Sequence, residues 1–188
     1  MARNKSKIAV IVGSTRKESI NRKLAQALAK LGEDRFDFTF VEIGGLPLYN
    51  QDLEADLPPS VTRMKAQVEA ADGILIVTPE HNRSIPAALK NVIDWVTRPY
   101  GTGKWQGKVA GIVGTSAGQV GTAIAQAHLR SILVAQGIAV MGRPEIYFIY
   151  KDGVFDAEHN VTDPQAKKIL EGFVEAFAKW ISRVPPAG

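Results

Sequence analysis

Three short apolar runs rich in β-branched residues each end in a polar loop, and each loop is followed by a helical pattern. The runs cover residues 7–13, 73–78 and 108–115. Strands that are buried on both faces of a parallel sheet show such continuous apolar runs instead of alternation. This order of strand, loop and helix therefore indicates a parallel sheet with helices on both faces.

The remaining segments extend the same alternation. Phe36, Phe38 and Phe40 alternate with polar residues, which predicts a second strand over residues 36–43 that is less buried and nearer a sheet edge. A short fifth strand is expected within residues 138–150. Helical patterns occupy residues 24–31, 60–71, 85–97, 122–136 and 164–183. We therefore expect one doubly wound, five-stranded α/β domain over residues 1–188.

The composition excludes several classes of function. The 188 residues include no cysteine, so thiolate chemistry and cysteine metal ligands are excluded and redox chemistry would need a bound cofactor. No apolar run approaches the ~18 residues of a membrane span, and the N-terminus lacks the apolar core of a signal peptide. We expect a cytoplasmic protein without membrane contact. The net charge of +4 is dispersed, which favours anionic small ligands over nucleic acid.

The first of the three loops has the residues of an anion site. Ligands of doubly wound sheets bind beyond the carboxyl ends of the strands, and here Ser14, Arg16, Ser19 and Asn21 stand between such an end and a helix. Backbone N–H groups and the helix dipole attract anions there. The alternative is that Ser19 or Asn21 only caps the helix. The number of polar side chains favours phosphate binding, although neither nucleotide-binding glycine fingerprint is present.

The second loop, residues 79–84, is a polar insert between a buried strand and an apolar helix. Its main-chain amides can hydrogen-bond a planar heterocycle. His81 alone would suit a metal ligand or a general base. The other histidines, His128 and His159, lie far from it in the sequence, so we predict no metal and treat His81 as a loop residue.

The third loop contains the pattern Gly-x-Ser-x-Gly, with Ser116 at its centre and Gly118 at its end. This pattern also forms the nucleophile elbow of serine α/β-hydrolases, and His159 follows in the right chain order. Against a hydrolase, the serine follows the fourth strand, the chain is short, and no oxyanion loop precedes it. The same glycines suit close approach of the backbone to a flat ligand.

The loops together resemble a known family. The segments GSTRKESIN (residues 13–21), TPEHN (78–82), LKNVIDW (89–95) and TSAG (115–118) are similar to those of the flavodoxin-like NAD(P)H-dependent FMN reductases, which include bacterial chromate and quinone reductases. The resemblance covers nearly the whole chain. One position departs from it, because the family usually has tyrosine where this chain has His81.

The resemblance implies a flavodoxin-like fold, bound FMN, and NADH or NADPH as co-substrate. No side chain is then expected to be a chemical catalyst, because the flavin carries the electrons to quinones, flavins or oxidised metal anions such as chromate. Ser14, Arg16, Ser19, Ile20 and Asn21 would hold the FMN phosphate; Pro79, Glu80, His81, Asn82 and Arg83 would line the ring; Ser116 and Gly118 would flank its other edge or the ribityl chain.

Two further expectations concern partners. The family is commonly dimeric or tetrameric, and the two-sided apolar helix at residues 85–97 fits a homodimer or homotetramer unless both its faces are buried in one subunit. The long loop at residues 44–59 suggests a functional or interface role. The closest alternative function is a flavodoxin-like electron carrier without NAD(P)H activity, but flavodoxins are usually acidic and this chain is not.

Overall fold

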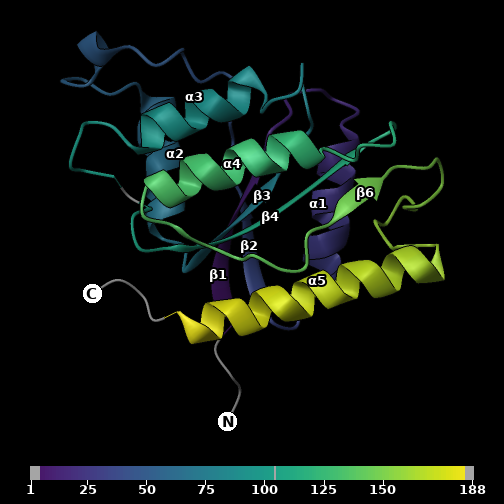
Figure 1. Cartoon of the computed structure of the whole chain (residues 1–188). Coiled ribbons are helices and arrows are strands. Elements are labelled where there is room, and N and C mark those ends of the chain that lie inside the picture. The colour runs from purple at the N-terminus through teal and green to yellow at the C-terminus, as the bar shows by residue number, and fades with distance from the viewer. Residues whose placement is uncertain (1–4, 104, 185–188) are drawn as a thin grey trace.

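A parallel sheet forms the centre of the computed structural model, which describes residues 5–103 and 105–184. The predicted domain ends, residues 1–4 and 185–188, lie outside the described residues. The strands are β1 (Ser6–Val12), β2 (Phe36–Phe40), β3 (Gly73–Val77), β4 (Val109–Ser116), β5 (Ala139–Val140) and β6 (Tyr147–Ile149). Their order is β2-β1-β3-β4-β5, with β6 paired to β4, and every pair is parallel (Figure 1). This order confirms the doubly wound sheet and places β2 at an edge.

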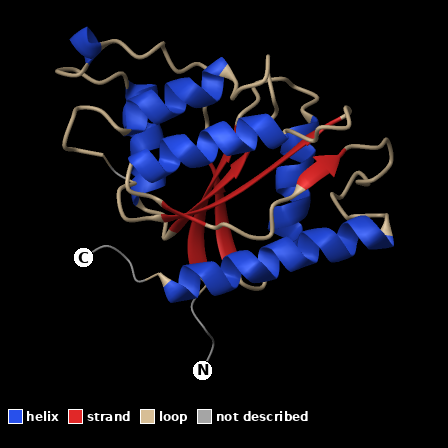
Figure 2. Ribbon diagram, viewed as in Figure 1, coloured by secondary structure: helices blue, strands red, loops and turns tan. Residues whose placement is uncertain are grey.

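Helices cover both faces of the sheet (Figure 2). They are α1 (Ile20–Leu31), α2 (Pro59–Glu69), α3 (Ala87–Val96), α4 (Ala123–Ala135) and α5 (Pro164–Arg183). Because neighbouring side chains of a strand point to opposite faces, Ile8 and Val10 pack with α1 and α5, whereas Ala9 and Ile11 pack with α2, α3 and α4. The two apolar layers explain why the central strands read as continuous apolar runs.

The end of the sheet differs from the single fifth strand that the sequence predicts. β5 pairs with the start of β4 at Val109 and Ala110, and β6 pairs with its end, from Gly114 to Ser116. Pro144 lies between the two short strands, and a proline cannot donate a hydrogen bond to a strand ladder. The last strand is therefore interrupted, and each piece supports a different end of β4.

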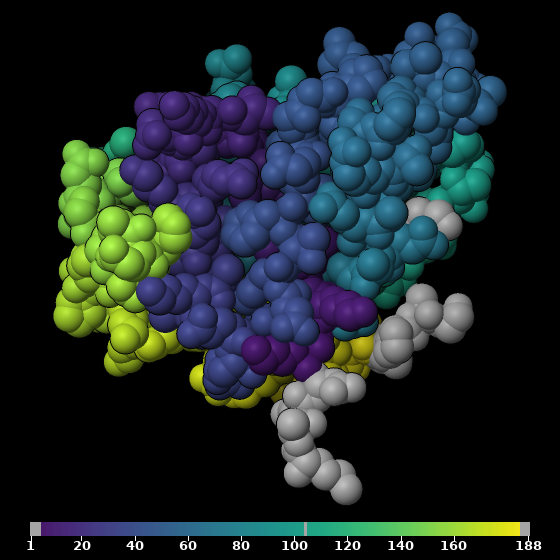
Figure 3. Space-filling view, turned by 180° about the vertical axis from the view of Figure 1, so that it is seen from behind, coloured from purple at the N-terminus to yellow at the C-terminus, as the bar shows by residue number. Residues whose placement is uncertain are grey.

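The loop at residues 44–59 packs on α3. The Pro47 carbonyl accepts hydrogen bonds from Asn91 Nδ2 at 2.9 Å and from Trp95 Nε1 at 2.8 Å, and Asn91 Oδ1 accepts one from Tyr49 N at 2.8 Å. A short 3₁₀ helix, Gln51–Leu53, follows. Seen from behind, this blue segment stands out at the upper right of the molecule (Figure 3). Leu89, Val92, Ile93 and Trp95 are all buried. Both apolar faces of α3 are thus buried within one subunit, so α3 gives no argument for an oligomer.

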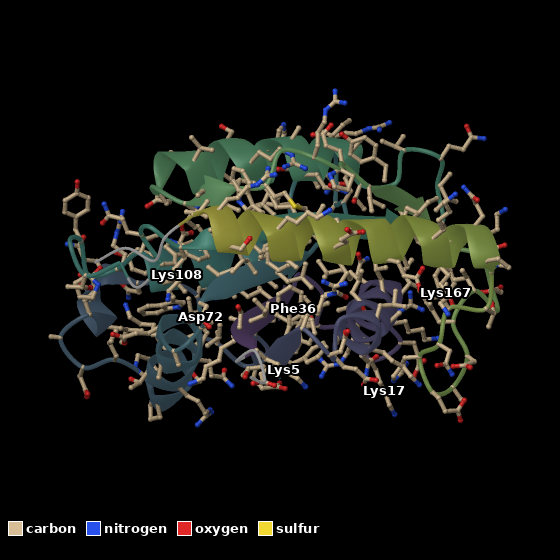
Figure 4. All side chains as sticks on the ribbon, turned by 90° about the horizontal axis from the view of Figure 1, so that it is seen from below. Lys5, Lys17, Phe36, Asp72, Lys108 and Lys167 are labelled. Carbon is tan, nitrogen blue, oxygen red and sulfur yellow. The ribbon has the colours of Figure 1, made fainter. Side chains whose placement is uncertain are left out.

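Two lysines lie at the carboxyl ends of helices, where unpaired carbonyls attract cations. The buried Lys65 ammonium donates to Trp95 O at 3.2 Å and also to Arg98 O, at the end of α3. Lys108 Nζ donates to Glu69 O at 3.0 Å and Ala71 O at 2.5 Å, at the end of α2. Burial lowers the pKa of Lys108, while the charges of Asp72 and Glu69 oppose that shift. Figure 4 shows Lys108 and Asp72 at the same end of the molecule.

The long C-terminal helix α5 has the bounds that its pattern predicts. Phe173 and Phe177 are buried, but Ile169, at the same spacing of four, is 41% exposed. Four residues turn an α-helix by about 400°, so a stripe with that spacing rotates gradually away from the core. Within the described residues, no helix is long and apolar enough to cross a membrane.

Candidate functional site

A cavity of about 520 Å³ opens at the carboxyl ends of β1, β3 and β4. The three loops that the sequence singles out meet there. Its lining comprises Gly13, Ser14, Thr15, Arg16, Ser19, Ile20, Asn21, Pro79, Glu80, His81, Pro86, Ala87, Ala88, Thr115, Ser116 and Ala117. Nine of the twelve predicted site residues therefore border one cavity, and the exceptions are Asn82, Arg83 and Gly118.

The first loop combines a helix cap with a cationic side chain. Ser19 Oγ accepts the N–H of Arg22 at 3.2 Å, and Ser19 is 4% exposed, so its hydroxyl caps α1 as the structural alternative proposed. Ser14 and Arg16 border the cavity, and Arg16 is exposed. The first N–H groups of a helix lack partners within it and attract an anion. Anion binding by Arg16, Ser14 and the start of α1 stays a prediction.

Asn21 joins the first loop to the third. Its Nδ2 donates to the Thr115 carbonyl at 2.9 Å, and its Oδ1 accepts the Thr115 N–H at 3.0 Å. Both residues are buried, and 94 positions separate them in the sequence. The carboxamide pairs with the main-chain N–H and C=O of Thr115 at the end of β4, as the main chain of a neighbouring strand would. Within the described chain, every hydrogen bond of the Asn21 side chain goes to Thr115. Asn21 therefore stabilises this wall of the cavity.

The second loop is a tight hairpin. His81 N donates to Ser84 O at 3.0 Å and Ser84 N to His81 O at 2.9 Å. The two residues between them, Asn82 and Arg83, have φ angles of 49° and 63°. Positive φ at both central positions is typical of a type I′ turn, whose twist matches that of paired strands. This turn presents His81 to the cavity and carries Asn82 and Arg83 away from its lining.

Glu80 borders the cavity and also caps a helix, while the ring contact that the resemblance implies stays a prediction. Its Oε2 accepts the N–H groups of Ile124 at 3.0 Å and Ala125 at 3.1 Å, in the first turn of α4. Thr122, which precedes α4, makes no side-chain cap. A carboxylate at a helix N-terminus satisfies free donors and interacts favourably with the dipole. Glu80 thus fixes the second loop to α4, and its other oxygen lies 3.8 Å from Arg83 Nη1.

The third loop lacks the contacts of a serine hydrolase. Ser116 Oγ donates to Gly118 O at 3.0 Å. A serine hydroxyl and a histidine do share a hydrogen bond at another place, where Ser84 Oγ lies 3.1 Å from His128 Nδ1. A nucleophilic serine needs a histidine within such reach. Among the residues that the structure describes, no imidazole contacts Ser116, and the hydrolase alternative loses its geometric basis.

Sequence reasoning missed several lining residues, which are Gly13, Thr15, Pro86, Ala87, Ala88, Thr115 and Ala117. Most are small, and small side chains allow a ligand to approach the backbone closely. Ala87 and Ala88 begin α3, directly after the second loop, so their position in the chain was a usable signal. The buried Thr115 Oγ1 has no hydrogen-bond partner among the described residues.

The lining suits an elongated ligand with an anionic end and a flat end. The start of α1 and Arg16 can hold a phosphate. Pro79, His81 and the alanines at the start of α3 offer an apolar surface and main-chain groups to a ring, and a cavity of this size is within the usual range for small ligands. These features fit FMN. Among the described residues, no group of three or more His, Asp or Glu side chains could hold a metal ion.

Comparison with known proteins agrees with this geometry. Residues 6–151 match the family described as NADPH-dependent FMN reductase. The chain is 48% identical to a 2-hydroxy-1,4-benzoquinone reductase of Burkholderia sp, over 93% of this chain and 96% of that protein. It is 43% identical to a quinone reductase of Pseudomonas putida, over 93% and 94%. The structure of the flavoenzyme NAD(P)H:(acceptor) oxidoreductase FerB of Paracoccus denitrificans matches with a TM-score of 0.93 and 47% identity, over 95% and 98%.

Proposed function

Because the chain belongs to the NADPH-dependent FMN reductase family, we propose that it transfers electrons from NAD(P)H through bound FMN to quinones. The chain is an NAD(P)H-dependent flavoenzyme, with FMN as its cofactor and NAD(P)H as co-substrate. Support for quinones as acceptors comes from the names of two relatives, which act on a benzoquinone and on quinones. The observation that carries the proposal is the meeting of all three strand-end loops at one cavity.

Each wall of the cavity has a separate task. Arg16, Ser14 and the N-terminus of α1 bind the phosphate. Pro79 and the main chain of the second loop orient the ring, and Ser116 borders the cavity from the third loop. When bound, FMN would supply the redox chemistry, which is to accept hydride and to pass electrons on. The protein contributes binding and orientation. Hydrogen bonds hold the loops in place, because Asn21 ties the first loop to the end of β4 and Glu80 ties the second loop to the start of α4.

The absorption spectrum of the purified protein tests this proposal. We expect flavin bands in the visible region, one FMN per chain, and NADH-dependent bleaching of those bands that a quinone reverses. Protein that shows no flavin bands even after FMN is added would refute the cofactor site. Bleaching that requires a second protein would favour the electron-carrier alternative.

We extend the proposal to chromate as a competent acceptor. Arg16 borders the cavity and the chain carries a net charge of +4, so an anion is attracted to the site. Arg83, the other cation near the loop, lies outside the lining and has a 68% exposed side chain. Salt screens exposed charges over about 10 Å at 0.1 M. The rate with chromate should fall as salt rises while the rate with a neutral quinone changes little, and equal responses would remove the electrostatic argument.

Free flavins as acceptors, a cytoplasmic location and assembly as a homodimer or homotetramer belong to the same proposal. Assembly rests on the dimers and tetramers that the resemblance implies. The large apolar side chains of Leu48, Tyr100 and Val134 are 79%, 90% and 63% exposed, and they would support assembly if they gathered in one patch. Sedimentation of the FMN-loaded protein measures the state directly, and a monomer at micromolar concentration would refute the assembly.

A further inference from the structure

The reduction of a quinone needs one more proton than NAD(P)H provides. The balanced reaction is NAD(P)H + H⁺ + quinone → NAD(P)⁺ + hydroquinone. Hydride brings two electrons and one proton, so the second proton must come from a group of the protein or from water. On the basis of the proposed function, we propose that the imidazole of His81 donates this proton to a quinone oxygen.

The cavity lining itself restricts the choice of donor. Among the described lining residues, the ionisable side chains are Arg16, Glu80 and His81. Arginine does not release its proton in proteins. The Glu80 carboxylate is occupied, since its Oε2 accepts two N–H groups of α4. Imidazole is the side chain that most often acts as a general acid in enzymes, so His81 is the member of this set that can serve as a donor.

The hairpin gives His81 a fixed position with access to solvent. Its main-chain N–H and C=O are both bonded to Ser84, which holds the backbone at the cavity wall. The side chain is exposed, so solvent can return a proton after each turnover. The charged and titratable groups around it are Glu80 and Arg83 in the same hairpin, Arg16 across the cavity, and His128 on α4, which bonds Ser84.

Stopped-flow kinetics of the FMN-loaded enzyme measures flavin reduction by NADH and flavin reoxidation by quinone separately. The two rates distinguish proton donation to the quinone from binding of FMN or NADH. We compare wild type with His81→Gln, and use His159→Asn as a matched control. His159 lies in a distant turn with a φ of 64°, which asparagine tolerates. In His81→Gln, flavin reduction by NADH should change less than about twofold, while reoxidation by a benzoquinone should slow by about 100-fold, the lower end of the usual range for general acids.

Ferricyanide provides the decisive comparison, because it accepts electrons without a proton. Its reaction with reduced His81→Gln should match that of wild type. The wild-type quinone rate should depend on pH, and the variant should lose that dependence. Equal slowing with both acceptors, or an unchanged quinone rate and pH profile, would overturn the role of His81. A wild type that binds no FMN, or whose flavin NADH does not reduce, would instead refute the proposed function.

Discussion

Replacing Asn21 with alanine should destabilise the chain far more than its place in a loop-to-helix junction would suggest. The change removes two hydrogen bonds, at 2.9 and 3.0 Å, to the main chain of Thr115. Thr115 is completely buried, so its N–H and C=O lose their partners inside the protein. Each buried polar group left unsatisfied costs about 1 to 3 kcal/mol.

The sum for two groups is about 2 to 6 kcal/mol, and we expect the lower half of this range, about 2 to 4 kcal/mol. Thr115 borders the cavity, so water can reach the exposed groups in part. The variant should also bind FMN more weakly, because the first and third loops are no longer held together.

Urea unfolding of the FMN-free protein, followed by circular dichroism, measures this loss of stability. Asn160→Ala is the matched control, since the Asn160 side chain also makes a hydrogen bond, at 2.7 Å to Asp156, but on the exposed surface. We expect the control to lose less than about 1 kcal/mol. If Asn21→Ala loses no more than the control, the link between the loops does not contribute to stability and the reasoning fails.

Three further predictions test the site and its support. Arg16→Ala should weaken FMN by about 1.5 to 3 kcal/mol and riboflavin much less, as measured by fluorescence titration, because only FMN carries the phosphate; equal losses would show that Arg16 does not contact the phosphate. Ser116→Ala should keep most NADH-dependent quinone reduction, and the wild type should not cleave activated esters; ester cleavage that disappears in this variant would restore the hydrolase. Lys65→Met should lower the free energy of unfolding by about 1 to 3 kcal/mol, because Trp95 O and Arg98 O lose a cationic donor; a change within error would mean that water replaces the ammonium.

The sequence predicts the sheet well because its signal is local. Buried parallel strands are recognisable as continuous apolar runs, and the bounds of α5 follow from its apolar pattern. The structure adds that the Asp163 side chain caps this helix. The divided last strand leaves no such signal. β5 and β6 contain two and three residues, too few for any periodicity, and only their pairing with β4 makes them strands.

The candidate site was predictable as a set of loops but not as a set of contacts. The position of Glu80 beside α4 depends on residues 44 and 45 positions away, so no local pattern distinguishes a helix cap from a ring contact. Asn21 is similar, since its partner lies 94 positions further along the chain. Polar residues near a ligand site often support the loops rather than the ligand, and the fold decides which they do.

The hydrogen bonds between Asn21 and Thr115 also have a consequence for folding during synthesis and for FMN uptake. A chain emerging from the ribosome makes the first loop early, but the third loop appears almost a hundred residues later, and β4 must pair before Thr115 reaches its partner. Contacts of such long sequence separation form late in folding. A nascent chain therefore has no complete cavity, and FMN can bind tightly only once nearly the whole sheet exists. The cofactor then stabilises the complete fold by mass action, so resistance to proteolysis should rise with the concentration of FMN.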